Sequence, residues 1–347
     1  MERRGDRDPG LIPLTGNYAE KRGMKNFSYF EPAGFKEALF LLAEHKGKSK
    51  ILAGGTDLIP QMKRGLSAPE TVIHLKGIPA LGEISESEEG LRIGAAVTLG
   101  SLERNSRLAS GYPGLHAAIS RVAMPAVRNS GTIGGNVCLD TKCIYRDQVQ
   151  TWDRALPPCF KSGGERCYVV RGGKTCHASL AGDTVPILIA LKAKAKVLSL
   201  AGERVIPVEE LYTGNGIRPL NLSAAELLAE ISIPRQEANG RAAYFRYSLR
   251  KAIDFPVASA AVFLAQKNGT CTESRVVLGA VAPRPLRLLE TERALNGQKI
   301  TERGLQDCAR QASQEALQIS KSGRMNRFTR EITASLVFQA LKKAWRG

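Results

Sequence analysis

The spacing of apolar residues along this chain alternates between helical and extended periods. Residues 34–45 (GFKEALFLLAEH) place their apolar side chains largely on one face, which predicts an amphipathic helix. The elements expected in this half are strands at 28–32, 71–75 and 91–95, and helices at 34–45, 98–109 and 114–122. Their alternation indicates a fold of mixed α and β layers.

This pattern stops between residues 139 and 176, where periodic apolar residues are scarce and prolines and a glycine pair appear. It resumes with a helix expected at 184–195 and a strand at 196–199. A new module begins near Pro207, and its short apolar runs read as strands with one intervening segment that suits a helix equally well. These runs cover residues 227–233, 242–249, 257–266 and 274–281, and residues 301–345 are expected to be mostly helical.

We therefore expect an α+β protein in three parts. Residues 1–25 are rich in charge, Pro and Gly, and are expected to form a disordered extension. Residues 26–205 form a first domain that carries residues 139–176 as an insertion. Residues 206–347 form a smaller α+β C-terminal domain.

Two glycine turns are the first features that indicate chemistry. In residues 51–57 (ILAGGTD) an apolar strand runs directly into a glycine pair. Glycines adopt backbone conformations closed to other residues and let successive N–H groups approach a bound anion. Thr56 adds a hydroxyl, and Asp57 is a candidate acceptor for a ribose or ribityl hydroxyl. The motif matches neither the dinucleotide GxGxxG pattern nor a P-loop.

The second turn, residues 130–136 (SGTIGGN), has three glycines within five residues, with a hydroxyl and an amide nearby. Its backbone also offers close approach and polar contacts. Two turns suited to phosphate groups in one domain fit a ligand with a pyrophosphate and an extended polar chain. A flavin dinucleotide meets that description better than a mononucleotide does.

Cysteines mark a second candidate site. The chain has seven, an odd number too small for a disulfide scaffold, and five of them lie within residues 137–182. The last four, Cys143, Cys159, Cys167 and Cys176, follow at intervals of 16, 8 and 9 residues, unlike paired zinc knuckles or a ferredoxin run. Because they lie in a polar loop, a four-thiolate metal site that orders the loop is favoured. Zinc and iron–sulfur both stay open, and a nearby flavin favours iron–sulfur.

The sequences AGGTDL at 53–58 and RNSGTIGGN at 128–136 together resemble the FAD-binding subunits of the molybdenum hydroxylase family. That family includes the medium subunits of xanthine dehydrogenase and carbon monoxide dehydrogenase. The similarity spans about residues 26–345 and implies a two-subdomain FAD-binding domain of the PCMH type, whose two glycine turns hold the cofactor. The implied cofactor-binding residues are Ile51, Leu52, Ala53, Gly54, Gly55, Thr56, Asp57, Thr132, Ile133, Gly134, Gly135, Asn136, Asp183 and Lys251.

The insertion departs from the usual family pattern, in which the second glycine turn leads within a few residues to the next helix. With cysteines in that position, the chain resembles the beta subunits of 4-hydroxybenzoyl-CoA reductases, whose insertion binds a [4Fe-4S] cluster. The resemblance implies the metal ligands Cys143, Cys159, Cys167 and Cys176. An exchange of roles between Cys138 and Cys143 stays open.

The same resemblance implies an electron-transfer subunit that does not itself bind the organic substrate. Electrons from a ferredoxin-type donor would pass through the cluster and FAD to [2Fe-2S] and molybdopterin centres, where an aromatic acyl-CoA is reductively dehydroxylated. The implied partners are a molybdopterin-binding large subunit and a [2Fe-2S] small subunit, in a dimer of heterotrimers. The alternative is the FAD subunit of a xanthine dehydrogenase or aldehyde oxidase-like hydroxylase that uses NAD, which has no use for four loop thiolates.

Charge and composition bear on other classes of function. The net charge is +17, from 50 Lys and Arg against 33 Asp and Glu, which raises nucleic acid as a candidate partner. Aromatic residues are only 6% and no stripe of basic and aromatic residues is visible, so a nucleic-acid-binding or zinc-based redox-sensing module is not expected. Residues 235–347 hold 20 basic against 9 acidic residues, which favours docking of partner proteins. The chain shows no signal peptide and no membrane span, which predicts a cytoplasmic protein.

Overall fold

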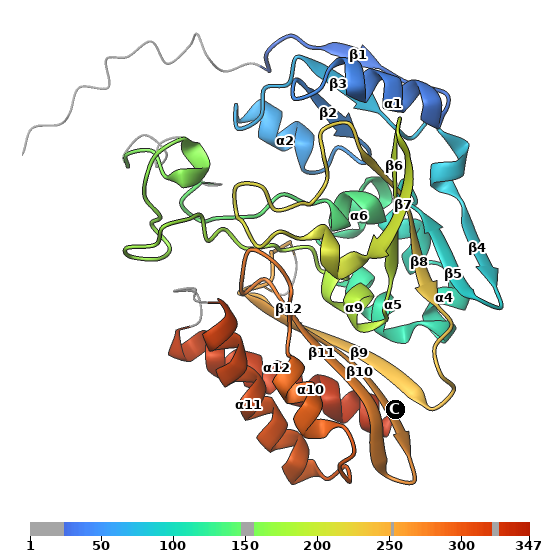
Figure 1. Ribbon diagram of the computed structural model, residues 1–347, viewed down its shortest axis with the longest axis vertical. Helices are drawn as coiled ribbons and strands as arrows, with labels where there is room; N and C mark the ends of the chain where they lie inside the picture. The colour runs from blue at the N-terminus through green and yellow to red at the C-terminus, as the bar shows by residue number, and fades with distance from the viewer. Residues whose placement is uncertain (1–23, 147–155, 251–252, 321–325) are drawn as a thin grey trace, which may run out of the picture.

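The computed structural model describes residues 24–146, 156–250, 253–320 and 326–347. Three sheets follow one another along the long axis of the molecule (Figure 1): a parallel sheet of three strands, an antiparallel sheet of five and an antiparallel sheet of four. This arrangement confirms the expected α+β class.

The parallel sheet forms the N-terminal subdomain. Its order is β1-β3-β2, with β1 (Ser28–Phe30) and β2 (Ser49–Leu52) on either side of β3 (Thr71–His74). The helix α1 (Phe35–Glu44) buries four residues of its predicted apolar face. The first glycine turn leaves the end of β2 and leads into the short helix α2 (Leu58–Lys63).

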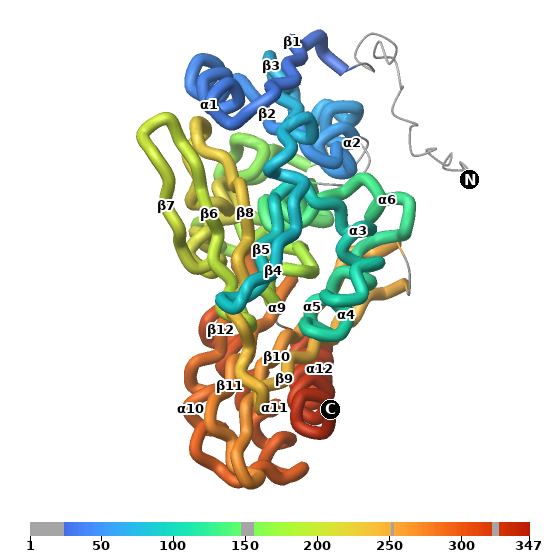
Figure 2. The backbone as a smooth tube through the Cα atoms, turned by 90° about the vertical axis from the view of Figure 1, so that its right-hand side faces the viewer, coloured from blue at the N-terminus to red at the C-terminus, as the bar shows by residue number. Residues whose placement is uncertain are grey.

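The second subdomain is built on a sheet of order β4-β5-β8-β6-β7. Its strands are β4 (Ile84–Ser87), β5 (Gly90–Gly94), β6 (Lys194–Ser199), β7 (Gly202–Pro207) and β8 (Leu227–Pro234). Short helices lie beside this sheet (Figure 2). They are α3 (Leu99–Glu103), α4 (Ser106–Gly111), α5 (Pro113–Ser120), α6 (Pro125–Ser130), α7 (Ile133–Val137) and α9 (Thr184–Ala190), with 3-10 turns at Pro79–Gly82, Phe160–Ser162 and Val208–Leu211.

The strand β8 extends the first domain beyond the boundary expected at residues 205/206. That boundary falls inside β7, and β8 pairs with both β5 and β6. The sheet therefore continues to Pro234. The pairing brings Gly94 opposite Glu230, and contacts between residues so distant in sequence leave no local pattern.

Two helices are shorter than expected. The helix expected at 98–109 is divided into α3 and α4, because the side chain of Asn105 accepts a hydrogen bond from the Leu108 N–H and begins a new helix. The helix expected at 184–195 ends at Ala190. Lys192 then adopts a left-handed φ of 58°, and the chain turns into β6.

The C-terminal domain packs three helices against a four-stranded sheet of order β12-β11-β10-β9, and the apolar runs expected at 242–249, 257–266 and 274–281 all form strands. Its elements are β9 (Gly240–Tyr247), β10 (Ala258–Lys267), β11 (Thr270–Gly279), β12 (Leu286–Arg287), α10 (Leu289–Leu295), α11 (Glu302–Ser320) and α12 (Arg327–Arg346). None of the helices in the described residues combines the length and the apolar character that crossing a bilayer requires.

Polar contacts fix the two domains to each other. The Leu180 N–H donates to the Ala282 carbonyl oxygen at 3.0 Å, and the Ala280 N–H donates to the Leu180 carbonyl oxygen at 3.1 Å. Lys192 forms an ion pair with Glu273 at 2.7 Å. The segment around α9 is therefore held on the C-terminal sheet, so elements of both domains surround the candidate site.

Candidate functional site

The two glycine turns lie directly against each other. A Cβ on Gly54 would lie 2.3 Å from the Ser130 carbonyl oxygen and 2.6 Å from the Gly131 Cα, closer than side chains approach. The Ser130 hydroxyl donates to the Gly54 carbonyl oxygen at 2.8 Å, and Lys76 Nζ donates to the Ser130 carbonyl oxygen at 3.0 Å. Only glycine at position 54 permits this contact.

The first turn presents backbone N–H groups that the protein does not use. Within the described chain, the N–H groups of Gly54, Gly55 and Thr56 donate to no protein acceptor. Gly55 has a φ of 70°, in the left-handed region that favours glycine. Successive free N–H groups in such a turn form a concave site for phosphate oxygens.

The second turn uses its neighbouring glycines differently. Gly134 is buried. Its N–H donates to the Ala95 carbonyl oxygen at 2.9 Å, and a Cβ added to Gly134 would lie 2.6 Å from the same oxygen. Ile133 is also fully buried. Gly135 is exposed, and its N–H is held by the Thr132 hydroxyl at 3.0 Å. Among residues 132–135, Gly135 therefore provides the open side of the turn.

Asn136 lies in α7 and Asp183 directly precedes α9, and both side chains have protein partners. Asn136 Oδ1 accepts from the Thr184 N–H at 3.1 Å and from its hydroxyl at 2.7 Å. Asp183 is buried and accepts from the Tyr244 hydroxyl at 2.6 Å and from Arg246 at 2.9 Å, both on β9. Burial raises the pKa of Asp183 to about 6, although Arg246 acts in the opposite direction. Proximity of these two residues to a flavin stays a prediction.

Asp57 connects the first glycine turn with the cysteine-bearing insertion. Its Oδ1 accepts from Lys142 Nζ at 2.5 Å, and its Oδ2 accepts from Gln61 Nε2 at 2.6 Å. Lys142 is buried and directly precedes Cys143. Both carboxylate oxygens thus have protein donors, whereas the sequence indicated a sugar hydroxyl as the partner.

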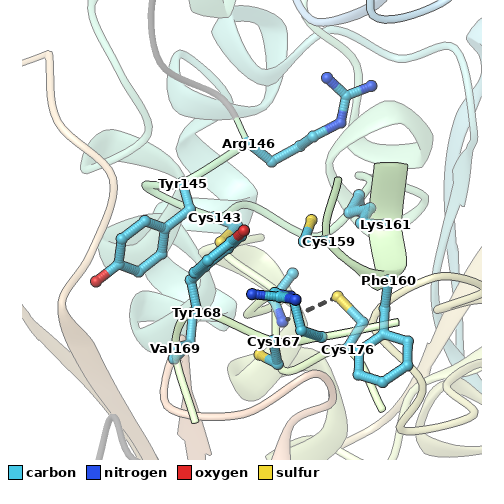
Figure 3. Close-up of a pocket in the computed structure, with 12 residues that line it drawn as sticks. Cys143, Tyr145, Arg146, Cys159, Phe160, Lys161, Cys167, Tyr168, Val169 and Cys176 are labelled. Carbon is cyan, nitrogen blue, oxygen red and sulfur yellow. Dashed lines mark hydrogen bonds between the residues drawn. The ribbon is translucent and has the colours of Figure 1, made fainter. Parts of the chain in front are cut away.

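Four cysteines of the insertion line one cavity (Figure 3). They are Cys143, Cys159, Cys167 and Cys176, joined by Tyr145, Arg146, Phe160, Lys161, Arg166, Tyr168, Val169 and Ala178. Cys138 lies elsewhere and packs against the core of the first domain, where burial raises its pKa to about 12. Of the two cysteines that the sequence left open, Cys143 is the one at the cavity.

The side chains of the cavity limit the kinds of metal centre that it could hold. In the described residues, no three His, Cys, Asp or Glu side chains are grouped closely enough to hold one metal ion. The cavity wall offers four thiols and neither carboxylate nor imidazole. Thiolates are the ligands of iron–sulfur clusters, and a four-iron cluster keeps its ligands apart by its own width. Four thiolates are also a donor set of structural zinc sites, so the chemistry of the wall fits a four-iron cluster and does not by itself distinguish it from zinc.

Burial and charge affect the cavity thiols in opposite directions. Burial raises the pKa of Cys176, while the Ala178 N–H and the nearby Lys161 ammonium lower it. The insertion also closes on itself, because Lys142 and Ser179 form an antiparallel bridge with hydrogen bonds of 2.7 and 2.9 Å. Residues 147–155 of the insertion, Lys251 and most of the expected extension, residues 1–23, lie outside the described residues.

Two family models match most of the chain. Residues 25–236 match the "FAD binding domain in molybdopterin dehydrogenase", and residues 243–344 match the "CO dehydrogenase flavoprotein C-terminal domain". The interval between these ranges lies at the passage from β8 to β9, in agreement with the sheet that ends at Pro234.

Individual relatives are similar over almost their full length. The xanthine dehydrogenase FAD-binding subunit of Escherichia coli O157:H7 is 28% identical, over 91% of this chain and 97% of the relative. The nicotinate dehydrogenase FAD-subunit of Eubacterium barkeri is 27% identical, over 80% of this chain and 82% of the relative. A chain in the structure of carbon monoxide dehydrogenase from Hydrogenophaga pseudoflava superimposes with a TM-score of 0.74 at 26% identity, covering 92% of this chain and 98% of that one.

Proposed function

Because the chain belongs to the family of FAD-binding subunits of molybdopterin dehydrogenases, we propose that it carries FAD and transfers electrons within a molybdenum-dependent oxidoreductase. The observation that carries this proposal is the contact of the two glycine turns at Gly54, beside backbone N–H groups with no protein acceptor. These features lie within the range that matches the FAD domain. The proposed partners are a molybdopterin-binding large subunit and an iron–sulfur small subunit, in a dimer of heterotrimers.

The residues present fit the cofactor. FAD supplies a centre that takes up two electrons together and releases them one at a time. The N–H groups of Gly54, Gly55 and Thr56 would hold its pyrophosphate, and the exposed Gly135 would admit the extended chain without a side chain in the way. The buried pair of Asp183 and Arg246 holds β9 against α9, which keeps the C-terminal domain in place beside the turns.

Two observations favour different chemistry for the complete complex. The relatives described above are subunits of dehydrogenases, which supports the hydroxylase-type alternative, in which electrons leave the substrate and reach an acceptor such as NAD. The four-cysteine cavity supports a subunit with a [4Fe-4S] cluster and a ferredoxin-type donor, as in the reductive dehydroxylation of an aromatic acyl-CoA. The ligands of that cluster would be Cys143, Cys159, Cys167 and Cys176. Of the two, the hydroxylase-type alternative has the stronger support, because it rests on similarity to known relatives.

Anaerobic purification followed by an absorption spectrum and assays of FAD, iron, sulfide and zinc tests the proposal. Protein without FAD would refute it. FAD with about four irons and matching sulfide per chain supports the cluster. FAD without iron would refute the cluster and leave the hydroxylase-type alternative.

Anaerobic reduction of the flavin distinguishes the two electron routes. The hydroxylase-type alternative predicts rapid reduction by NADH, and the cluster-dependent route predicts reduction by a reduced ferredoxin. The variant Cys159→Ala should abolish reduction by the ferredoxin and leave FAD bound. Unchanged reduction by the ferredoxin in this variant would refute the cluster-dependent route.

A further inference from the structure

Lys161 brings a positive charge into the wall of the cysteine cavity. Its Nζ donates to Asp140 Oδ1 at 2.8 Å and to the carbonyl oxygens of Thr141 and Gly216 at 3.0 and 3.1 Å. It also contacts the Thr141 hydroxyl at 2.5 Å. The side chain is only 11% exposed, so this ammonium is held inside the protein and not in solvent.

The groups around this ammonium lie near three of the cysteines, either on the same segment or packed against it. Thr141 lies two residues before Cys143, and Lys161 itself lies two residues after Cys159. Gly216 packs on Cys176: its N–H donates to the Cys176 carbonyl oxygen at 3.3 Å, and an added Cβ would lie 2.8 Å from Cys176 Sγ. One ammonium therefore connects three separate segments of the chain, and Lys161 itself lines the cavity together with the four cysteines (Figure 3).

The charge of Lys161 is only partly balanced by its neighbours. Of the four acceptors, Asp140 alone is an anion, and its side chain is 43% exposed. Solvent weakens the field of an exposed carboxylate more than that of a buried ammonium. The lining of the cavity itself holds the cations Arg146, Lys161 and Arg166 beside the four thiols and, among the described residues, includes no carboxylate.

We propose that Lys161 is a positioning residue for the cysteine cavity, which holds Cys143, Cys159 and Cys176 in place and whose charge favours electron uptake by a cluster bound there. This inference rests on the proposed function, because it requires a cluster in the cavity. A positive charge stabilises an added electron and raises the reduction potential, and Asp140 opposes it. Removal of the Lys161 charge should thus lower the reduction potential of the cluster, and removal of the Asp140 charge should raise it.

The test compares the variants Lys161→Met and Asp140→Asn in the full chain, purified anaerobically with FAD. Iron and sulfide per FAD are measured after challenge with a chelator, and the cluster potential is measured by a dye-mediated titration followed by EPR. Lys161→Met should retain about 10-fold less iron, and its remaining clusters should have a lower potential. Lys161→Arg, which keeps the charge, should restore most of the iron. Asp140→Asn should raise the potential.

Lys174→Met is the matched control, because Lys174 is an exposed cation of the same insertion that does not line the cavity. It should change neither iron content nor potential. Unchanged iron and potential in Lys161→Met overturn the inference, and so do potentials that shift in the same direction in both variants. If Lys161→Met fails to bind FAD, an unchanged or lowered potential in Asp140→Asn overturns it.

Failure of the proposed function is recognised separately. Unsubstituted protein without iron overturns the cluster assignment and this inference together. Unsubstituted protein with a full cluster, combined with unaffected variants, overturns this inference alone.

Discussion

Lys142 Nζ lies 2.5 Å from Asp57 Oδ1, so the residue before Cys143 is tied to the first glycine turn. The two residues are 85 positions apart and belong to the two different candidate sites. The lysine side chain is buried, and the aspartate side chain is 33% exposed. This ion pair therefore couples the position of the insertion to the conformation of the first glycine turn.

Substitutions at this pair should weaken FAD binding in a non-additive way. Asp57→Asn and Lys142→Met should each raise the dissociation constant of FAD, and the double variant should be little worse than either single one, because both remove one interaction. We expect a coupling energy of about 1 kcal/mol, since Asp57 is partly exposed to solvent. Titration of the apoprotein of each variant with FAD measures it. Fully additive losses would show that the two sites are independent.

Gly54→Ala should reduce FAD binding strongly, because a Cβ at this position meets the Ser130 carbonyl oxygen and forces the two glycine turns apart. An overpacking cost of about 1–3 kcal/mol corresponds to a loss of about 5- to 150-fold in affinity. Gly111→Ala is the control, since a Cβ there meets no atom within 4 Å. Equal FAD content in both purified variants would contradict the required contact.

The cavity predicts which cysteines matter for iron. Cys159→Ala should lose iron and keep FAD, and Cys138→Ala should keep both, because Cys138 packs on the core away from the cavity. Iron and FAD assays on anaerobically purified variants measure this. Loss of iron in Cys138→Ala, with iron retained in Cys159→Ala, would contradict this prediction.

In the unsubstituted protein Cys138 should also resist alkylation at pH 8, because burial raises its pKa to about 12 and keeps it protonated.

Asp183 should make stability depend on pH. Burial raises its pKa from 3.8 to about 6, so the folded state holds the proton more tightly than the unfolded state. Asp183 therefore contributes on the order of 3 kcal/mol to the free energy of unfolding. The full contribution is present below about pH 4, and it is lost as the pH rises through about 6. Asp183→Asn cannot ionise, so its unfolding free energy should lack this decline.

Chemical unfolding from pH 4.5 to 7.5 measures this difference between the unsubstituted protein and Asp183→Asn. Asp307→Asn, an exposed position on α11, serves as the control and should follow the unsubstituted protein. Parallel curves for the unsubstituted protein and Asp183→Asn would show that Asp183 does not titrate in this range.

Local patterns predicted the parts of the site that depend on consecutive residues. A strand that runs into Gly54 and Gly55 is visible in the sequence, because backbone conformation there follows from the glycines themselves. The grouping of four cysteines around one cavity also followed the expectation from their polar loop. The strands and helices were predicted where the apolar period was regular, as in α1 and α12.

Long-range partners had no comparable signal. Lysines are common and usually solvated, so nothing near Lys142 or Lys161 in the sequence marks them as buried and paired with Asp57 and Asp140. The pairing of β8 with β5 is equally non-local, which is why the first domain extends beyond the expected boundary. Such contacts follow from the assembled fold and not from any window of the sequence.

The bridge between Lys142 and Ser179 has a consequence for how the fold tolerates changes in the length of the insertion. The two ends of the segment between them therefore lie side by side, and its described residues, 143–146 and 156–178, contribute no strand to any of the three sheets. Loop length at such a point affects folding free energy only weakly. A change in the length of the cysteine-bearing insertion should therefore leave the three sheets in place.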